Sequence, residues 1–327
     1  MRTAIVGCGR MGQRRAEAID GGVLVAVADP DEARARALAS RFPGCVSHRD
    51  WRTVVTRPDL DAVIVATTND ALAPVTLAAV QQGKHVLVEK PGARRAAELA
   101  PVAEAARAAG VTVKVGFNHR FHPAVLKARA LFDEGAVGPL LYIRGRYGHG
   151  GRLGYEREWR ADPTVAGGGE LLDQGVHLLD LARWFAGDFA EATGALATYY
   201  WSMPVEDNAF VLLRTAGGEV AWLHASCTEW KNLFSFEIFG RDGKLQLDGL
   251  GGSYGIERLT LYRMRPEMGP PETTTWEYPG EDPSWRAEWR HFLDAVAGKV
   301  EPWGSLPDAL AVLRLVERVY ERAGPLS

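Results

Sequence analysis

The sequence has 327 residues, of which 46% are hydrophobic, and a formal net charge of −3 at pH 7. This length suits two domains of roughly 150 residues each, and the absence of a basic excess gives no electrostatic case for binding nucleic acid or an anionic membrane. The three cysteines, Cys8, Cys45 and Cys227, include no CxxC pair, which favours reduced thiols in a cytoplasmic protein over a disulfide framework or a zinc cage.

Short apolar runs alternate with helical patterns through residues 1–118. A strand close to the start leaves no room for a secretory signal, and no apolar run approaches the ~20 residues of a membrane helix. The alternation predicts an α/β fold with a doubly wound parallel sheet of the Rossmann type, in which ligands bind beyond the carboxyl ends of the strands. We expect strands at 3–6, 23–28, 62–66, 85–88 and 111–115, and helices at 11–19, 31–41, 71–82 and 96–109.

The first strand is followed by a complete GxGxxG, Gly7-Cys8-Gly9-Arg10-Met11-Gly12. Gly7 permits a tight turn, Gly9 lets the backbone approach a pyrophosphate, and Gly12 lets the helix pack close to the strand. The diphosphate then lies on the helix N-terminus, where free N–H groups and the helix dipole stabilise negative charge. Three glycines in an ordinary turn are the alternative, but this strand–loop–helix context favours a dinucleotide site that includes Arg10 and Met11.

Asp29 lies at the end of the second predicted strand, 22 residues after Gly7. An acidic residue at this position accepts hydrogen bonds from the adenosine ribose and repels a 2′-phosphate. Asp29-Pro30-Asp31, with no Arg directly after it, therefore favours NAD over NADP, with Arg34 as the nearest basic residue that follows.

Other strand ends supply further candidate cofactor contacts. Thr67 and Asn69 follow the strand at 62–66, and capping of the next helix is an equally weighted role for Asn69. Asn118 follows the last strand of this half and completes the candidate cofactor contacts.

Glu89 and Lys90 end the strand that begins at residue 85. A Lys at the carboxyl end of this strand is expected to point into the crevice near the nicotinamide, with Glu89 offsetting the cost of burying its charge. The structural alternative is a surface Lys before a helix-starting Pro.

From residue 119 onward strands predominate, and no linker separates the second domain, 119–327, from the first, 1–118. Tyr199-Tyr200-Trp201 and Trp222 favour sheet packing or an oligomer contact over a carbohydrate platform. We expect a hairpin over 210–226 through Gly217-Gly218. The predicted elements of the second domain are strands at 141–147, 190–201, 209–213, 220–226, 233–239, 244–247 and 259–262, and helices at 124–134, 285–296 and 307–323.

The segment 167–184 reads GGGELLDQGVHLLDLARW. A glycine-rich turn opens a predicted helix in which Asp173, His177 and Asp180 share one face, at i, i+4 and i+7, among apolar residues that predict burial. Because buried Asp and His are costly unless paired, this face is either a satisfied structural network or a reaction site. The spacing permits a metal, but no further His–Glu pairing completes such a site, and we expect none. A buried carboxylate–imidazole pair behind a dinucleotide domain suits hydride transfer coupled to proton transfer.

The sequence resembles the glucose–fructose oxidoreductase / inositol dehydrogenase / rhizopine-catabolism (Gfo/Idh/MocA) family essentially from end to end. The combination of EKP with the later DxxxHxxD, behind a Rossmann fingerprint, is highly specific. The resemblance implies a substrate-binding and oligomerisation α+β domain with an open, largely antiparallel sheet, whose outer face often forms homodimers or homotetramers. The markers are GCGRMG at 7–12, Asp29, ATTND at 66–70, GKHVLVEKP at 83–91, GFNHRFHP at 116–123 and the segment 167–184.

The resemblance further implies that Lys90, Asp173 and His177 are the catalytic group. Lys90 would touch the substrate hydroxyl and the nicotinamide ribose, His177 would exchange the substrate proton, and Asp173 would orient and polarise the imidazole. The peptide between Lys90 and Pro91 would be cis.

Two departures from the family pattern affect the site. Many members read T-P-N-x-x-H after the strand at 62–66, whereas this chain has Thr68 and Leu72 in place of the Pro and the His, which puts one cofactor-side contact in doubt. Many members also have a Tyr where this chain has Trp285, so the substrate pocket is expected to differ there.

We therefore predict an NAD(P)-dependent oxidoreductase acting on a CH–OH group of a sugar, cyclitol or related polyol. Its rivals are a lyase or hydrolase that retains bound NAD, a non-catalytic dinucleotide sensor, and another Rossmann reductase. Retention of both Lys90 and His177 disfavours the sensor. Candidate substrate contacts, each with surface or packing roles as the alternative, are Arg120, His149, Tyr155, Trp159, Arg160 and Trp285.

Overall fold

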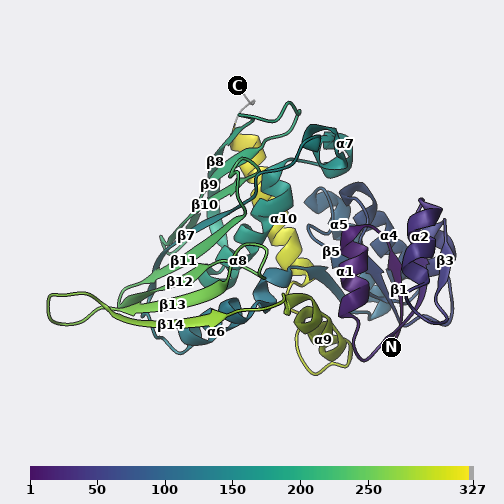
Figure 1. Cartoon of the computed structure of the whole chain (residues 1–327), viewed down its shortest axis with the longest axis horizontal. Helices are drawn as coiled ribbons and strands as arrows, with labels where there is room; N and C mark the ends of the chain where they lie inside the picture. Colours follow the sequence, from purple (N-terminus) through teal and green to yellow (C-terminus); the bar gives the residue numbers. More distant parts are fainter. Residues whose placement is uncertain (324–327) are drawn as a thin grey trace. The chain divides into compact units, whose positions relative to one another are not determined.

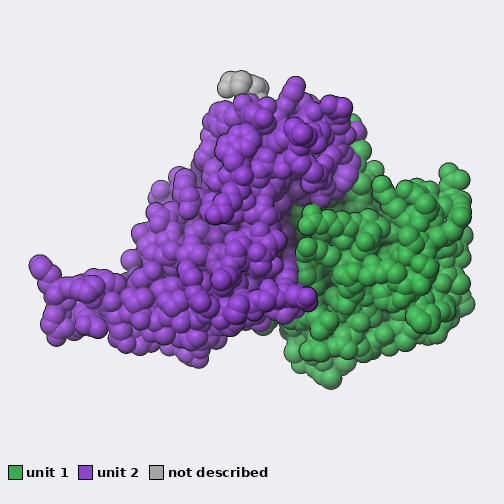
Figure 2. All heavy atoms as spheres, viewed as in Figure 1, with its two compact units in different colours: residues 1–117, 164–167, 285–313 green, residues 118–163, 168–284, 314–327 purple. Residues whose placement is uncertain are grey.

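The computed structural model describes residues 1–323, which form two compact units (Figure 2). Unit 1 contains residues 1–117, 164–167 and 285–313, and unit 2 contains residues 118–163, 168–284 and, of the described chain, 314–323. The first segment of unit 1 ends at residue 117, and two later segments, 164–167 and 285–313, also belong to this unit. The last four residues of the predicted second domain, 324–327, lie outside the described part.

The return of residues 285–313 to unit 1 has a physical cause in the core. Trp289 and Phe292 of the last-but-one helix pack in one buried cluster with Ile5, Leu24 and Leu87 of the parallel sheet. Burial of two large aromatic side chains is worth several kcal/mol, at about 25 cal/mol per Å². The amphipathic pattern of this helix predicted that one face is buried, but not in which core.

Unit 1 is built on a six-stranded parallel sheet with the order β3-β2-β1-β4-β5-β6, which confirms the doubly wound α/β prediction. This is the Rossmann order, in which the crevice for a ligand lies where the strand order reverses, beyond β1 and β4. The strands are β1 (Arg2–Val6), β2 (Val23–Ala28), β3 (Val46–His48), β4 (Ala62–Val65), β5 (His85–Glu89) and β6 (Val113–Gly116).

The helices of unit 1 follow the predicted ones to within three residues at each end. Gly110, just after α5, has a left-handed conformation and closes that helix, as expected. The helices are α1 (Arg10–Ala18), α2 (Glu32–Ala39), α3 (Trp51–Val55), α4 (Asn69–Gln81), α5 (Ala96–Ala109), the short α7 (Pro163–Ala166) and α9 (Ser284–Val296). The sequence did not predict α3 or β3, which are too short to show a period.

Unit 2 contains an eight-stranded sheet with the order β14-β13-β12-β11-β7-β10-β9-β8 (Figure 1). All neighbouring strands are antiparallel except β7 and β10, so the predicted open and largely antiparallel sheet is confirmed, as is the β9–β10 hairpin. The strands are β7 (Leu140–Gly148), β8 (Phe189–Ala197), β9 (Asn208–Thr215), β10 (Val220–Ser226), β11 (Leu233–Gly240), β12 (Gly243–Asp248), β13 (Glu257–Arg263) and β14 (Glu272–Tyr278).

The helical segments of unit 2 include α8, which packs against β7 and β10, and α6, which packs against β12, β13 and β14. Side chains on the other face of the sheet stay exposed, among them Tyr142, Leu212 and Trp222. The helical segments are η1 (Asn118–Phe121), α6 (Pro123–Asp133), η2 (Tyr155–Arg157), η3 (Trp159–Ala161), η4 (Leu171–Gly175), α8 (Val176–Ala186) and α10 (Leu306–Arg322), whose residues up to 313 belong to unit 1.

The strand predicted over 190–201 ends earlier, at Ala197, because the carboxylate of Asp207 holds the next residues in a turn. Its oxygens accept the backbone N–H groups of Tyr199, Tyr200 and Trp201 at 2.9, 2.8 and 3.1 Å. Trp201 is buried against Tyr155 and Cys227, whereas Tyr199 and Tyr200 are exposed. The prediction of strand structure for these aromatic residues is therefore wrong.

All three cysteines are free thiols. Among the helices of residues 1–323, none combines the length and the apolar character required to span a bilayer.

Candidate active site

The glycine-rich loop has the close backbone approaches that the motif predicted. Gly7 has φ of 94°, and a Cβ there would lie 2.3 Å from the carbonyl oxygen of Ala66, while a Cβ at Gly12 would lie 1.9 Å from the carbonyl oxygen of Gly7. A Cβ at Gly9 would meet nothing within 4 Å. Gly9 is also the N-cap of α1, and no side chain at this position accepts a hydrogen bond from the N–H groups of the first turn. The loop thus fits a diphosphate on the helix N-terminus.

Asp29 lies at the carboxyl end of β2 and is directed at the same loop. One carboxylate oxygen accepts the N–H of Cys8 at 2.7 Å, and the other accepts the N–H of Asp31 at 2.9 Å. Asp31 in turn caps α2 and pairs with the guanidinium of Arg34, with 3.2 Å between Nε and Oδ2. Burial, and then the charge of Asp29, raise the pKa of the Cys8 thiol to about 12, so Cys8 stays protonated.

The segment after β4 differs from the predicted cap. The N-cap of α4 is Thr68, and Asn69 is already the first helical residue. The side-chain amide of Asn69 instead donates to the carbonyl oxygen of Ala166 at 2.9 Å, and so fixes the returning segment 164–167 to unit 1. The hydroxyl of Thr67 donates to the carbonyl oxygen of Thr68 at 3.0 Å.

The peptide between Lys90 and Pro91 is cis, as the family resemblance implied. The carboxylate of Glu89 accepts a hydrogen bond from Nε of Arg15 at 2.6 Å, a partner that the sequence analysis did not expect. Arg15 also donates to Glu288 at 2.5 Å, and Glu288 accepts Nζ of Lys114 at 2.7 Å. These two cations and two carboxylates form a buried network in unit 1, which the sequence analysis missed.

Trp285, a candidate substrate contact, lies beside this network in unit 1. The guanidinium of Arg15 lies 4.5 Å from the centre of its ring, and that of Arg14 lies 5.7 Å from it. Such geometry allows cation–π attraction. Its ring thus covers the buried network.

In unit 2, Gly168 and Gly169 precede the predicted catalytic helix and pack against Tyr320 and Glu206. The side chain of Glu206 is the acceptor at this point of the chain. Its carboxylate accepts the N–H groups of Gly169 and Leu171 at 3.2 and 3.0 Å and the hydroxyl of Tyr320 at 2.8 Å. A Cβ at Gly169 would lie 2.1 Å from the carbonyl oxygen of Glu206, and one at Gly168 would lie 2.1 Å from the Tyr320 oxygen. Burial raises the pKa of the Glu206 carboxyl, against the lowering effect of these donors.

The helix predicted after the glycine-rich turn begins with one π-helical turn, η4, and continues as α8. Such turns insert a residue into the helical repeat and are frequent at functional sites. Asp173 lies inside this turn, and its carboxylate accepts a hydrogen bond from Nε of Arg160 at 3.0 Å. The negative charge of Asp173 raises the pKa of Arg160. The carboxylate of Asp180 accepts hydrogen bonds from Nε and Nη2 of Arg120, at 2.7 and 2.6 Å. The expectation of one continuous α-helix is therefore wrong, and Asp180 serves a buried ion pair.

His177 is the first candidate catalytic group of α8, and only 5% of its surface is exposed. Its ring stacks on that of His119, with 3.8 Å between the ring centroids and 15° between the planes. Tyr147 on β7 meets both imidazoles edge-on. Neither His119 nor Tyr147 was singled out from the sequence, although His119 lies in the GFNHRFHP block beside Arg120.

Glu170 is a further residue that the sequence analysis missed. This buried carboxylate, directly after the triglycine, accepts the hydroxyl of Tyr155 at 2.9 Å and lies 3.7 Å from Nε2 of His149. Burial, and then the charge of Glu170, raise the pKa of Tyr155, so its hydroxyl stays protonated. Two candidate substrate contacts therefore converge on Glu170. Its position between the triglycine and a buried helix was the available signal.

The remaining candidates have local partners in unit 2. The ring of Trp159 lies 4.6 Å from the guanidinium of Arg160. The side-chain amide of Asn118 donates to the hydroxyl of Ser284 at 2.9 Å. Among residues 1–323, no group of three or more His, Cys, Asp or Glu side chains is placed to hold a metal ion.

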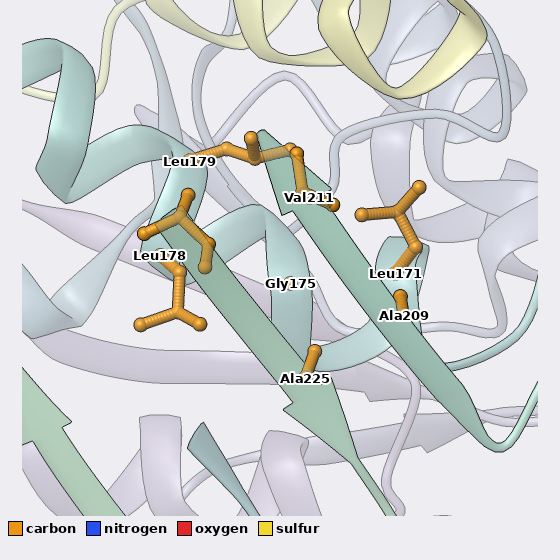
Figure 3. A pocket seen from close by; sticks show the side chains of 8 residues that line it. Leu171, Gly175, Leu178, Leu179, Ala209, Val211 and Ala225 are labelled. Atoms are coloured by element: carbon orange, nitrogen blue, oxygen red, sulfur yellow. The ribbon is translucent and has the colours of Figure 1, made fainter. Parts of the chain in front are cut away.

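A small gap lies between the start of α8 and the sheet (Figure 3). Its side chains are those of Leu171, Leu178, Leu179, Val211 and their neighbours, which carry no polar atoms. A polar ligand would find no hydrogen-bond partner on these side chains. The gap therefore belongs to the packing of the helix on the sheet and is not a candidate substrate site.

The sequence matches two family profiles. One, described as an oxidoreductase family with an NAD-binding Rossmann fold, covers residues 1–117, which places the chain among the dinucleotide-binding oxidoreductases. The other, described as a GFO/IDH/MocA C-terminal domain, covers residues 125–246. The chain belongs to the Gfo/Idh/MocA family, as its motifs indicated.

Similar proteins of known name include dehydrogenases. Levoglucosan dehydrogenase of Pseudarthrobacter phenanthrenivorans is 30% identical over 257 residues, which are 68% of this chain and 63% of that enzyme. Inositol 2-dehydrogenase 2 of Saccharopolyspora erythraea is 28% identical over 313 residues, 93% of this chain and 84% of that enzyme. A solved levoglucosan dehydrogenase in complex with NADH and levoglucosan has a TM-score of 0.88 at 25% identity and covers 99% of this chain, with 97% of its own chain matched. This chain thus spans less than two thirds of the first relative and most of the other two.

Proposed function

We propose that the protein is an NAD-dependent dehydrogenase that transfers a hydride between nicotinamide and a secondary alcohol or ketone of a sugar, cyclitol or related polyol. The observation that carries this proposal is the buried imidazole of His177, four residues after Asp173 and held between aromatic rings. Histidine exchanges protons near neutral pH and suits the proton transfer that accompanies hydride transfer. The relatives named for levoglucosan and inositol support the substrate class.

In this proposal the loop at Gly9 and the N-terminus of α1 hold the diphosphate. The carboxylate of Asp29 accepts hydrogen bonds from the hydroxyls of the adenosine ribose. When bound, the nicotinamide ring gives or accepts a hydride. A 2′-phosphate would face the Asp29 carboxylate, while the guanidinium of Arg34 is already paired with Asp31. Both features support NAD over NADP.

The other proposed cofactor contacts divide into two groups. Arg10, Met11, Thr67, Lys90 and Asn118 keep this role. The hydrogen bonds of Asn69 to Ala166 and of Glu89 to Arg15 favour positioning roles for these two side chains.

Lys90, Asp173 and His177 are the proposed catalytic group. During oxidation, His177 takes the proton of the substrate hydroxyl, and the ammonium group of Lys90 stabilises the charge that develops on the oxygen. Asp173 favours the charged imidazolium through its negative charge. The ion pair with Arg160 holds the carboxylate of Asp173 in its ionised form.

For the substrate hydroxyls, we propose His149, Tyr155, Trp159 and Arg160, with Glu170 as the carboxylate that organises the first two. Two earlier candidates are assigned structural roles instead. These are Arg120, whose guanidinium pairs with Asp180, and Trp285, whose ring covers Arg15.

We also propose that copies of the chain associate through the exposed face of the eight-stranded sheet, as a homodimer or homotetramer. Tyr142, Leu212 and Trp222 stand on this face and are each more than 40% exposed. Trp222 lies opposite both Leu212 and Arg144 in the sheet register. Exposed aromatic and Arg side chains of this kind are enriched at protein interfaces.

The proposal is tested by a spectrophotometric screen of polyols, aldoses, inositols and nucleotide sugars with NAD and with NADP. We expect net cofactor reduction with at least one polyol, and a higher kcat/KM with NAD. Lys90→Met and His177→Asn should each lower kcat by about 10²- to 10⁴-fold. Lys299→Met, which removes an exposed surface lysine, is the matched control and should leave the rate unchanged.

The outcomes separate the rival functions. Substrate turnover without net cofactor reduction would indicate a lyase or hydrolase that retains NAD. Tight NAD binding without turnover of any compound would indicate a sensor. Rates close to wild type in both Lys90→Met and His177→Asn would contradict the catalytic assignment.

A further inference from the structure

His119 and His177 form a pair of stacked imidazoles inside unit 2. His119 comes from η1, directly after the first segment of unit 1, and His177 comes from α8, 58 residues later in the chain. Their ring centroids lie 3.8 Å apart with an interplanar angle of 15°. The two side chains are only 4% and 5% exposed, so the stack is shielded from water.

The surrounding rings fix the orientation of this stack. Tyr147 meets the ring of His119 edge-on at 4.9 Å and that of His177 at 6.0 Å. Phe234 meets His119 edge-on at 5.8 Å. The ring torsion of histidine is intrinsically broad, and a face contact together with an edge contact restricts it to one plane. The imidazole of His177 is thereby oriented before a substrate is present.

The charged and titratable groups around the pair come from several elements. On η4 and just before it are the carboxylates Asp173 and Glu170, and on β7 is Tyr147. Burial, followed by Tyr254 and these two carboxylates, raises the pKa of Tyr147, which therefore remains neutral. The same two carboxylates act on Tyr147, which meets both imidazoles edge-on.

Two further polar side chains, Arg120 and His122, lie close to His119 in the chain, and each has a carboxylate partner. Arg120 forms its bidentate ion pair with Asp180. The ring centroid of His122 lies 5.7 Å from that of His119. Nδ1 of His122 lies 2.9 Å from a carboxylate oxygen of Glu257. The positive charge of Arg120 is therefore compensated locally.

We propose that His119 is a positioning residue for His177, because its stacked ring fixes the plane of the catalytic imidazole. At the pH of the reaction, at most one of the two rings is an imidazolium ion. Two imidazolium ions in face contact would repel each other strongly in a site shielded from water. A charge on one ring therefore opposes a charge on the other. His177 takes a substrate proton while His119 is neutral, and the charge that it then carries is the only one on the pair.

This inference rests on the proposed function, because it assigns His119 a role through His177. The stacked geometry offers no in-plane hydrogen bond between the two rings, so His119 does not relay the proton. Its contribution is to hold the ring and to keep its neighbour neutral.

The proton count is tested without cofactor or substrate, by NMR of the protein labelled with ¹⁵N-histidine. Coupled groups titrate as a pair, so we expect the protonated fractions of His119 and His177 to sum to no more than about one between pH 8 and pH 5. In His119→Phe, which keeps a flat ring, His177 should take up a full proton alone. Independent protonation of both rings within this range in the wild type would overturn the proposal.

The positioning role is tested by kinetics of two variants. His119→Ala removes the ring and should lower kcat by about 10-fold or more with little change in KM, whereas His119→Phe should retain kcat within about 3-fold. His224→Phe is the matched control, since His224 also stacks on a ring, that of Phe210 at 4.2 Å, but belongs to β10. It should leave kcat unchanged.

Failure of this inference is distinguishable from failure of the proposed function. If His177→Asn keeps near wild-type rates, the catalytic assignment fails, whatever the His119 variants do. If His177→Asn is inactive while His119→Ala is as fast as wild type, the positioning role is wrong and the function stands. If His119→Ala does not fold, His119→Phe and the proton count of the wild-type protein still decide the question.

Discussion

At the scale of single residues, Arg15 is a buried cation in the last turn of α1, with 2% of its surface exposed. Burial alone would lower its pKa, but attraction to Glu89 and Glu288 raises it, so the guanidinium stays charged. Glu288, buried with it, has a lowered pKa because Lys114 and Arg15 outweigh its desolvation. Each charge is thus retained because an opposite charge touches it.

Replacement of Arg15 by Met would leave Glu89 and Glu288 buried with one cation fewer. We expect Arg15→Met to lower the free energy of unfolding by about 3–5 kcal/mol, as for a buried pair that loses one partner. Arg36→Met removes a cation from the exposed pair with Glu32 and should cost less than about 1 kcal/mol. Urea unfolding followed by tryptophan fluorescence measures both. Equal effects of the two variants would contradict the structural role of the network.

The sequence could predict the place of a single residue in the site only where that residue belongs to a local motif. Gly7, Gly12 and Asp29 stand at fixed spacings behind a strand, and the structure places them in the expected loop. Arg15 and Glu288 are separated by 273 positions, and no local pattern pairs them. His119 belongs to a block that was recognised, but its contact with His177 depends on how η1 packs against α8.

At the scale of elements, the segment from Gly169 to α8 depends on a contact from elsewhere in the chain. The carboxylate of Glu206 receives two backbone N–H groups and a hydroxyl at the point where the π-helical turn begins. The sequence predicted a helix here because apolar residues surround it on nearly all sides, and such a pattern indicates burial without indicating the type of turn. The pattern alone could not separate a π-helical turn from an α-helical one.

Loss of the Glu206 carboxylate would leave the buried N–H groups of Gly169 and Leu171 without their acceptor. Each unsatisfied buried donor costs about 1–3 kcal/mol, so Glu206→Ala should destabilise the protein by about 2–5 kcal/mol. Tyr320→Phe loses a single hydrogen bond and should cost about 1 kcal/mol. The exposed neighbour variant Glu321→Ala is the control, and thermal unfolding ranks the three. If Glu206→Ala is no worse than Glu321→Ala, the proposed anchoring role is wrong.

The elements that the sequence did not predict lack a readable pattern. β3 has only three residues, and α3 has five. The strand β14, with the sequence ETTTWEY, is mostly exposed at the edge of the sheet and pairs only with β13 among the described strands. Strand prediction depends on alternating apolar residues, which an exposed edge strand does not need. Longer buried elements such as α5 and β10 were predicted with the correct bounds.

At the scale of the whole molecule, the two units keep their chemistry apart in the sequence. The dinucleotide loop and Lys90 lie in unit 1, whereas Asp173, His177 and the stacked His119 lie in unit 2. The order of the motifs along the chain separates them in this way, because each motif is local. The return of residues 285–313 to unit 1 was not predictable, because it depends on which core accepts Trp289 and Phe292.

The central claim is that a hydride passes directly between a polyol carbon and the nicotinamide. The most direct test uses inositol deuterated on every ring carbon, or the corresponding form of the best polyol from the screen, with NAD in ordinary water. Mass spectrometry of the reduced cofactor should show one deuterium per turnover on the nicotinamide ring, because the hydride comes from the carbinol carbon. Deuterium released into the solvent, or a reduced cofactor that carries none, would contradict the account.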